Sequence, residues 1–155
     1  MKKTAKNRNM YTPEESSPLQ EKFINYLMKD GKKTKSRKIF NDTLKIISKK
    51  LSGDPEKIFK TAIGNVKPRM EVKAKRIGGA VYQVPREVSP DRQISLAFRW
   101  IIQASRGKKG SPMAQRLANE LIDASNEQGS AVKKKEDTHK MAQANKAFAH
   151  FARYR

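Results

Sequence analysis

Residues 72–88, Val-Lys-Ala-Lys-Arg-Ile-Gly-Gly-Ala-Val-Tyr-Gln-Val-Pro-Arg-Glu-Val, interrupt an otherwise helical sequence with two short strand-like runs. The runs meet at Gly78-Gly79, and such a pair is typical of a tight β-hairpin turn because glycine adopts positive φ without strain. Pro85 has no amide hydrogen to donate to a neighbouring strand, so its run lies at a sheet edge. We therefore expect a hairpin that projects from the body and probes a nucleic-acid groove or a neighbouring molecule. Three bases precede its turn and one aromatic residue follows it: Lys73, Lys75, Arg76 and Tyr82.

The rest of the chain has the pattern of helices. Four dipeptides place an N-cap oxygen before a proline at the first helical position: Ser17-Pro18, Asp54-Pro55, Ser89-Pro90 and Ser111-Pro112. Ser17 and Gln20 also match a capping box, and Thr34 is the expected cap of the second helix. Apolar residues at helical spacing predict six helices, at about 18–30, 35–51, 55–67, 90–105, 112–128 and 131–151.

These elements predict a mainly α fold: a six-helix single-domain bundle with a protruding two-stranded β-hairpin and a basic N-terminal tail. The short linkers favour antiparallel packing of neighbouring helices. We expect the tail to cover residues 1–16. Residues 17–155 are then the helical domain, with the hairpin arm at 72–88.

Charge dominates the composition. The 155 residues include 35 Lys and Arg against 15 Asp and Glu, so the formal net charge is +20. Folding does not favour so much self-repulsion, and a polyanionic partner explains it. Binding would depend on phosphate contacts and weaken steeply as salt rises. The bases gather in five segments, at residues 2–8, 32–38, 67–76, 106–116 and 133–140.

Several classes of protein are excluded by what the sequence lacks. There is no cysteine, which excludes disulfides and thiolate metal sites and suits a reducing compartment. The longest apolar cluster, Phe98 with Trp100–Ile102, is too short to span a bilayer, so no membrane partner is expected. His139 and His150 stand on one predicted helix about 16 Å apart along its axis, too far to share a metal. We expect no catalytic residue, no metal and no cofactor.

Three classes of nucleic-acid-directed protein would account for the positive charge. RNA is favoured, because bases spread over tail, loops, hairpin and several helices suit the irregular phosphate surface of a folded RNA. A helix-turn-helix DNA binder stays open, since a short basic loop joins the fourth and fifth helices. An RNA-modifying or nucleolytic enzyme is the third, and the missing His/acid constellation argues against it.

Aromatic and histidine side chains receive plainer interpretations. Trp100 belongs to the core, His139 is a further donor in a basic face, and His150 is a surface residue. The C-terminal aromatics, Phe148 and Phe151, either seal the last helix to the body or dock onto RNA or a neighbouring protein together with Arg153 and Tyr154.

Four segments resemble the family of bacterial-type small-subunit ribosomal protein S7. The resemblance runs from about Leu19 over nearly the whole chain, and residues 30–33, Asp-Gly-Lys-Lys, fit the family's first interhelical turn. The ending Phe151-Ala-Arg-Tyr-Arg155 departs from the family's common Tyr-Arg-Trp finish. The four segments are the hairpin at 72–85, Ala97-Phe-Arg-Trp-Ile-Ile102, Leu117-Ala-Asn-Glu-Leu121 and the run from Ala131 to His150.

The resemblance implies a six-helix body with an extended hairpin and a non-enzymatic, structural role in translation. Members of this family bind the 3′ major domain of small-subunit ribosomal RNA, nucleate assembly of the head, and place the hairpin near the exit-site transfer RNA and the messenger RNA exit path. Ribosomal proteins S11 and S9 are the implied neighbours, and no homo-oligomer is expected. The implied location is the ribosome of the bacterial cytoplasm, with the mitochondrial matrix or plastid stroma as the alternative.

The candidate site residues combine the basic segments with positions carried over from the family. The tail is expected to order only on RNA. The candidate rRNA-binding residues are Lys2, Lys3, Lys6, Arg8, Lys32, Lys33, Lys35, Arg37, Lys67, Arg69, Lys73, Lys75, Arg76, Arg92, Arg106, Lys108, Lys109, Met113, Arg116, Lys133, Lys134, Lys135, His139 and Lys140. The arm directed toward transfer RNA and the messenger exit consists of Arg76, Ile77, Gly78, Gly79, Ala80, Val81 and Tyr82.

Overall fold

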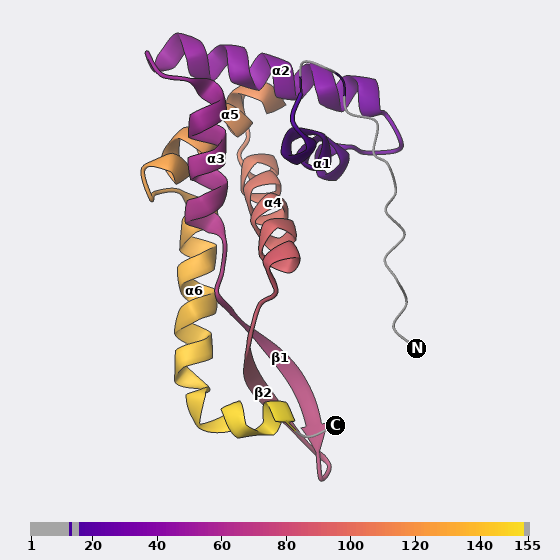
Figure 1. Cartoon of the computed structure of the whole chain (residues 1–155), viewed down its shortest axis with the longest axis vertical. Helices are drawn as coiled ribbons and strands as arrows, with labels where there is room; N and C mark the ends of the chain where they lie inside the picture. The colour runs from indigo at the N-terminus through magenta and orange to yellow at the C-terminus, as the bar shows by residue number, and fades with distance from the viewer. Residues whose placement is uncertain (1–12, 14–15, 154–155) are drawn as a thin grey trace.

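The computed structural model describes residue 13 and residues 16–153. The predicted tail therefore lies almost wholly outside the described residues, as do Tyr154 and Arg155. Over the described range the chain forms six α-helices, one 3-10 helix and one antiparallel hairpin, which confirms the predicted mainly α fold (Figure 1). The elements are α1 (Pro18–Leu27), α2 (Lys33–Lys50), α3 (Pro55–Val66), β1 (Met70–Ile77), β2 (Ala80–Glu87), α4 (Pro90–Gly107), α5 (Met113–Ser125), α6 (Ser130–Ala144) and η1 (Lys146–Arg153).

Local caps begin two of the helices as predicted. At α1 the capping box is complete: Ser17 Oγ accepts the Gln20 amide at 3.3 Å, and Gln20 Oε1 accepts the Ser17 amide at 3.1 Å. At α3 the Asp54 carboxylate accepts the Glu56 amide at 2.9 Å. Ser89 occupies the N-cap position of α4, but its side chain makes no capping hydrogen bond there. The starts at residues 18, 55 and 90 are confirmed.

Two predicted N-cap residues, Thr34 and Ser111, are wrong. Pro112 is itself the N-cap of α5, which begins one residue later. Helix α2 begins at Lys33, so Thr34 lies inside the helix and does not cap it. Lys33 and Arg37 are one turn apart on α2, and both form ion pairs with Glu21 of α1. These ion pairs stabilise the first turn of α2, which has no side-chain cap in the local sequence.

Helices α1 and α5 end earlier than predicted. Helix α1 ends at Leu27, and Asp30 and Gly31 then take φ values of 53° and 70°. Helix α5 ends at Ser125, and Glu127 takes a φ of 58°. Residues in this left-handed region end a helix and redirect the chain.

The predicted last helix consists of two elements. Helix α6 ends at Ala144, and the chain turns into η1, which runs across to the hairpin (Figure 1). The turn brings Phe148 and Phe151 against Tyr82 of β2, with ring centroids 5.3 and 4.8 Å from the tyrosine ring. Burial of aromatic surface against a distant strand therefore outweighs the helical pattern of residues 145–151.

Four phenylalanines form the centre of the core, one from each of α1 to α4. Phe23 packs against Phe40, Phe59 and Phe98 with ring centroids 5.6, 5.2 and 5.1 Å away. All four side chains are buried, and apolar residues of α5 and the start of α6 join the same cluster. Helices α1 to α6 therefore share one hydrophobic core.

Helix α5 packs against four of the other five α-helices. It contacts α2, α3, α4 and α6, and it lies behind α3 in Figure 1. Helix α2 lies across the end of α3, so the predicted antiparallel packing of these neighbours is wrong (Figure 1). A central α5 buries the apolar faces of both helices, which removes the need for them to lie along each other.

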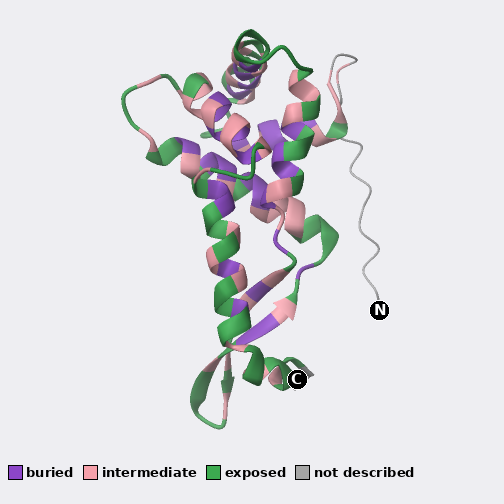
Figure 2. Ribbon diagram, turned by 90° about the vertical axis from the view of Figure 1, so that its left-hand side faces the viewer, coloured by how far each residue is buried: buried purple, intermediate pink, exposed green. Residues whose placement is uncertain are grey.

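The hairpin has the predicted turn. Ile77 pairs with Ala80, and Gly78 and Gly79 between them have φ values of 56° and 89°. Its base is not freely projecting, because Val84 and Pro85 are buried and the strands contact α6 and η1. Only the outer part of the arm is exposed, as Figure 2 shows by the green tip below the purple body. The expected projection is therefore correct for the tip and wrong for the base.

Candidate nucleic-acid interface

Many of the bases predicted to bind RNA are held by contacts within the protein. The first case is Glu21 of α1, which is completely buried. Arg37 lies 2.8 Å from one of its carboxylate oxygens and Lys33 lies 3.3 Å from the other. Burial by itself would raise the pKa of Glu21, but hydrogen bonds from Ser16 and Lys33 and the charges of Arg37 and Lys33 lower it below 4.5.

A second buried acid organises the base of the hairpin. Glu71 of β1 accepts hydrogen bonds from Arg86 of β2 and from Arg92 of α4, the latter at 2.9 and 3.0 Å. Burial would raise the pKa of Glu71, but the two guanidinium groups outweigh it and lower the pKa below 4.5. Arg92 was a candidate RNA ligand, and the structure gives it the additional role of fixing the arm to the body.

The third buried acid lies on α5. Lys108 Nζ is 2.7 Å from Glu120 Oε2 and 3.5 Å from Asp123 Oδ2, and Glu120 Oε1 accepts the Ala131 amide at the start of α6. Burial would lower the pKa of Lys108, but the two carboxylates raise it. Glu120 therefore joins the basic α4–α5 loop to the beginning of α6.

Other candidate bases hold backbone carbonyls. Arg106 donates to the Leu27 carbonyl at 3.1 Å, and Arg116 donates to the carbonyls of Arg106 and Lys108. Lys135 donates to the Asn65 carbonyl at 2.7 Å, and Lys75 donates to the Phe151 carbonyl at 2.9 Å. Arg106, Lys135 and Lys75 thereby join segments that lie far apart in the sequence, whereas Arg116 holds the neighbouring α4–α5 loop.

A second group of bases has no partner within the described chain. Their side chains make no hydrogen bond or ion pair with any other part of it, so their charge is not neutralised there. They lie at the α1–α2 turn and the start of α2, between α3 and β1, on the hairpin, in the α4–α5 loop and along α6. The group consists of Lys32, Lys35, Lys67, Arg69, Lys73, Arg76, Lys109, Lys133, Lys134 and Lys140.

The fold brings two distant basic segments together around one hollow. Lys32, the N-cap of α2, and Lys35 in its first turn face Arg106 at the end of α4 and Met113 at the start of α5. The hollow has a volume of about 310 Å³. Segments 32–38 and 106–116 therefore form one surface, which the sequence could not indicate.

A second hollow joins segments 67–76 and 133–140. Lys67 and Arg69 line it together with Lys135 and His139 of α6. His139 Nε2 accepts the Arg69 backbone amide at 3.0 Å. Burial, followed by the charges of Lys135 and Arg69, lowers the pKa of His139 below 6.5. Nε2 is therefore occupied as an acceptor, and the donor predicted for the basic face is the Nδ1–H group of this half-buried ring.

The N-terminal bases, His150 and Trp100 are the other residues named from the sequence. Lys2, Lys3, Lys6 and Arg8 lie outside the described residues. His150 is exposed, as expected, and Trp100 packs only partly against the core. Sequence reasoning missed Glu21, Glu71 and Glu120. The signal for Glu120 was present, because it falls on the same helical face as Leu117, Leu121 and Ala124.

The arrangement of α5 does not fit a helix-turn-helix reading. A recognition helix must present one face to a DNA groove. On α5, only Gln115 is exposed, while Leu117, Ala118, Leu121 and Ala124 are buried. Helix α5 is therefore an interior element.

No helix among the described residues is both long and apolar enough to cross a bilayer. No group of three or more His, Cys, Asp or Glu side chains in the same part of the chain is placed to hold a metal ion.

The fold and its surface define the class: a basic, mainly helical protein of the nucleic-acid-binding kind, with a β-hairpin arm. Residues 1–146 match the sequence model of the family described as Ribosomal protein S7p/S5e. This chain therefore belongs to the ribosomal protein S7 family.

Individual relatives support the same assignment, and each is named small ribosomal subunit protein uS7. The one from Nitratiruptor sp. is 60% identical over 134 residues, which are 84% of each chain. The relative from Solidesulfovibrio magneticus is 54% identical over 139 residues, and that from Prochlorococcus marinus subsp. pastoris is 52% identical over 139 residues. Both alignments cover 90% of this chain and 89% of the relative. The resemblance noted from the sequence motifs is confirmed.

Proposed function

We propose that this protein is a structural constituent of the small ribosomal subunit that binds the 3′ major domain of the ribosomal RNA directly and nucleates assembly of the head. The observation that carries the proposal is the match of residues 1–146 to a single ribosomal protein family. The bases without partners in the described chain support it, because they lie on several elements and face in several directions. The protein acts by binding, with no catalytic step.

The division of the bases suggests how the binding is organised. The bases of the α1–α2 turn, the α4–α5 loop and α6 contact ribosomal phosphates, while the ion-paired bases keep their elements in position. The exposed tip of the arm, residues 76–82, reaches toward the exit-site transfer RNA and the messenger exit path. Ribosomal proteins S11 and S9 are the neighbouring proteins in this proposal.

The proposed location is the ribosome of the bacterial cytoplasm. The bacterial relatives support it over the alternative of a mitochondrial matrix or plastid stroma. Isolation of the small-subunit particle with which the tagged protein copurifies tests the location and the partners together.

Binding specificity tests the central proposal. Purified protein is titrated with a fragment of the 3′ major domain and with duplex DNA of equal length, over the same series of salt concentrations. We expect much tighter binding to the RNA at each salt concentration, with affinity that falls as salt rises. Equal affinity for both across the series would contradict an RNA-specific function. A helix-turn-helix protein would instead dimerise and prefer one duplex site.

A further inference from the structure

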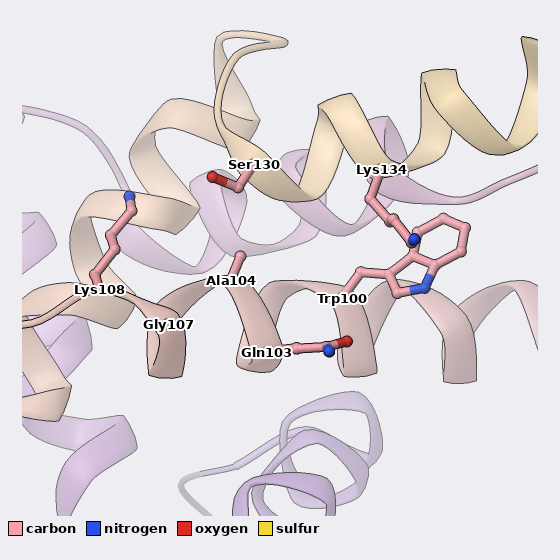
Figure 3. Close-up of a pocket in the computed structure, with 7 residues that line it drawn as sticks. All are labelled: Trp100, Gln103, Ala104, Gly107, Lys108, Ser130 and Lys134. Carbon is pink, nitrogen blue, oxygen red and sulfur yellow. The ribbon is translucent and has the colours of Figure 1, made fainter.

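A groove between α4 and α6 presents the chain's single tryptophan beside a lysine (Figure 3). Trp100, Gln103, Ala104 and Gly107 form its α4 side, and Lys134 extends from α6 toward the indole ring. The four α4 residues are spaced three or four apart, so they lie along one face of that helix. This groove is separate from the two hollows described above.

Small residues keep the groove open. Ala104 and Gly107 carry little or no side chain, and a Cβ added at Gly107 would meet no atom within 4 Å. The groove has a volume of about 410 Å³. Pockets for small ligands commonly have volumes of roughly 300–1,000 Å³. There is room for a planar ring next to the indole.

The groove has the chemistry of a base-binding site. Trp100 is half-buried: part of it packs against the core, and the rest lines the groove. An aromatic face stacks with any nucleobase. Gln103 is exposed and carries one amide donor group and one carbonyl acceptor, which match the polar edge of a base.

Lys134 is the cation available in the groove. Lys108 also lines it, but its charge is neutralised by Glu120 and Asp123. Lys134 makes no side-chain hydrogen bond or ion pair with the rest of the described chain. An ammonium group beside a stacking platform is the arrangement used to hold a base and the phosphate next to it.

We propose that this groove binds one unpaired RNA base, stacked on Trp100, with the adjacent phosphate on Lys134. The proposal rests on the RNA-binding function proposed above and adds a specific contact to it. Trp100 then has two roles, as part of the core and as a stacking surface, rather than the core role alone that the sequence indicated.

Intrinsic fluorescence tests the stacking directly, because Trp100 is the chain's single tryptophan. The protein is titrated in two separate experiments, one with the 3′ major domain fragment and one with a transfer RNA. Binding is followed independently by the anisotropy of labelled RNA. We expect the fluorescence to be quenched in parallel with binding, and acrylamide to reach the bound indole less readily. Quenching by only one of the two RNAs assigns the base to that RNA.

The outcomes separate the two proposals. The ribosomal fragment could bind tightly while neither RNA changes the tryptophan fluorescence or its access to acrylamide. That result would overturn the stacking site and leave the proposed function standing. Failure to bind the fragment at all would remove both.

Matched variants test the side chains. Trp100→Leu keeps apolar bulk against the core and should lose about fivefold to a hundredfold in RNA affinity, whereas Trp100→Phe should keep most of it. Lys134→Gln should bind more weakly than Lys57→Gln, which removes an exposed lysine of α3 outside the groove and outside the proposed RNA-binding residues. Thermal unfolding followed by circular dichroism verifies that each variant is folded. Equal affinities of the Leu and Phe variants would contradict stacking, and equal affinities of the two Gln variants would remove the phosphate contact.

Discussion

Three buried glutamates each hold a basic side chain in a fixed position. Glu21, Glu71 and Glu120 belong to α1, β1 and α5, and each pairs with a base from another element or loop. Leaving a buried carboxylate without its partner costs more than the net gain of an average surface ion pair. Part of the chain's large positive charge therefore also supports the fold.

Glu71 predicts how stability depends on pH. Its folded pKa is below 4.5, so the unfolded chain takes up protons first as pH falls. The stabilisation by the ionised Glu71 carboxylate is complete above the pKa of Glu71 in the unfolded chain. It is lost as pH falls through the lower pKa of Glu71 in the folded protein. Glu71→Gln should lower the free energy of unfolding by about 1–2 kcal/mol at pH 7, and the difference from wild type should shrink below pH 4.5. Denaturant melts from pH 7 to pH 3 measure this, and a constant difference would contradict it.

A second effect on stability is expected at Gly129, the N-cap of α6. Its φ of 93° and ψ of 172° lie in a region that is essentially restricted to glycine. A Cβ there would also lie 3.1 Å from Asp123 Cβ and from Glu120 Oε1. Gly129→Ala should lower the free energy of unfolding by about 1–3 kcal/mol. Gly107→Ala is the control, since that position is open and should be neutral or slightly stabilised in the same denaturant melts.

Among the elements, the hairpin and η1 depend on each other. Phe148 and Phe151 cover Tyr82, and Lys75 Nζ donates to the Phe151 carbonyl. Neither predicted role for the C-terminal aromatics describes this, because they pack on the arm rather than on the helical body. The orientation of the arm is therefore set at its side by η1 as well as at its base by Glu71.

Removing the aromatic contact should loosen the arm alone. We expect Phe151→Ala to speed amide hydrogen exchange in β1 and β2 by about tenfold, the effect of losing about 1.4 kcal/mol of local stability. Exchange in α3 and α5 should be unchanged, because their residues lie in the separate helical core. Ala147→Gly, at an exposed position in η1, is the control. Exchange that increases equally in arm and body would contradict a local clamp.

Shortening the tip tests the division between anchor and arm. Lys75 and Tyr82 are paired in register, so Gly-Gly in place of residues 76–81 would close a two-residue turn. The tip contributes little buried surface, so stability should change by less than about 1 kcal/mol and binding of the ribosomal RNA fragment should be largely kept. Ribosomes that carry the variant should be impaired at the exit site. A variant that does not fold would contradict this assignment.

At the scale of the whole molecule, the positive charge falls into two groups with different effects. Lys35→Gln removes a base without a partner in the described chain, so it should weaken RNA binding and reduce the salt slope by about 1 with unchanged stability. Arg37→Gln removes a partner of the buried Glu21, so it should lower the free energy of unfolding by about 1–3 kcal/mol. Salt titrations and denaturant melts of both variants measure the two effects. Identical behaviour of the two variants would contradict the division.

The sequence by itself determined the features that depend on neighbouring residues. The capping box of Ser17 and Gln20, the start of α3 at Asp54-Pro55 and the Gly78-Gly79 turn are all local, and each was predicted correctly. Net charge and the apolar faces of the helices are also properties of the chain itself, so the fold class and the polyanionic partner followed from them.

Only the tertiary structure decided which bases pair within the protein and which have no partner in the described chain. That division depends on pairs such as Arg37 with Glu21 and Lys135 with Asn65, which folding brings together from distant positions. The break between α6 and η1 has the same origin, since it follows from the aromatic contact with Tyr82. Local spacing carries no information about such partners, because their energies exist only when the packed chain places the two groups within a few ångströms of each other.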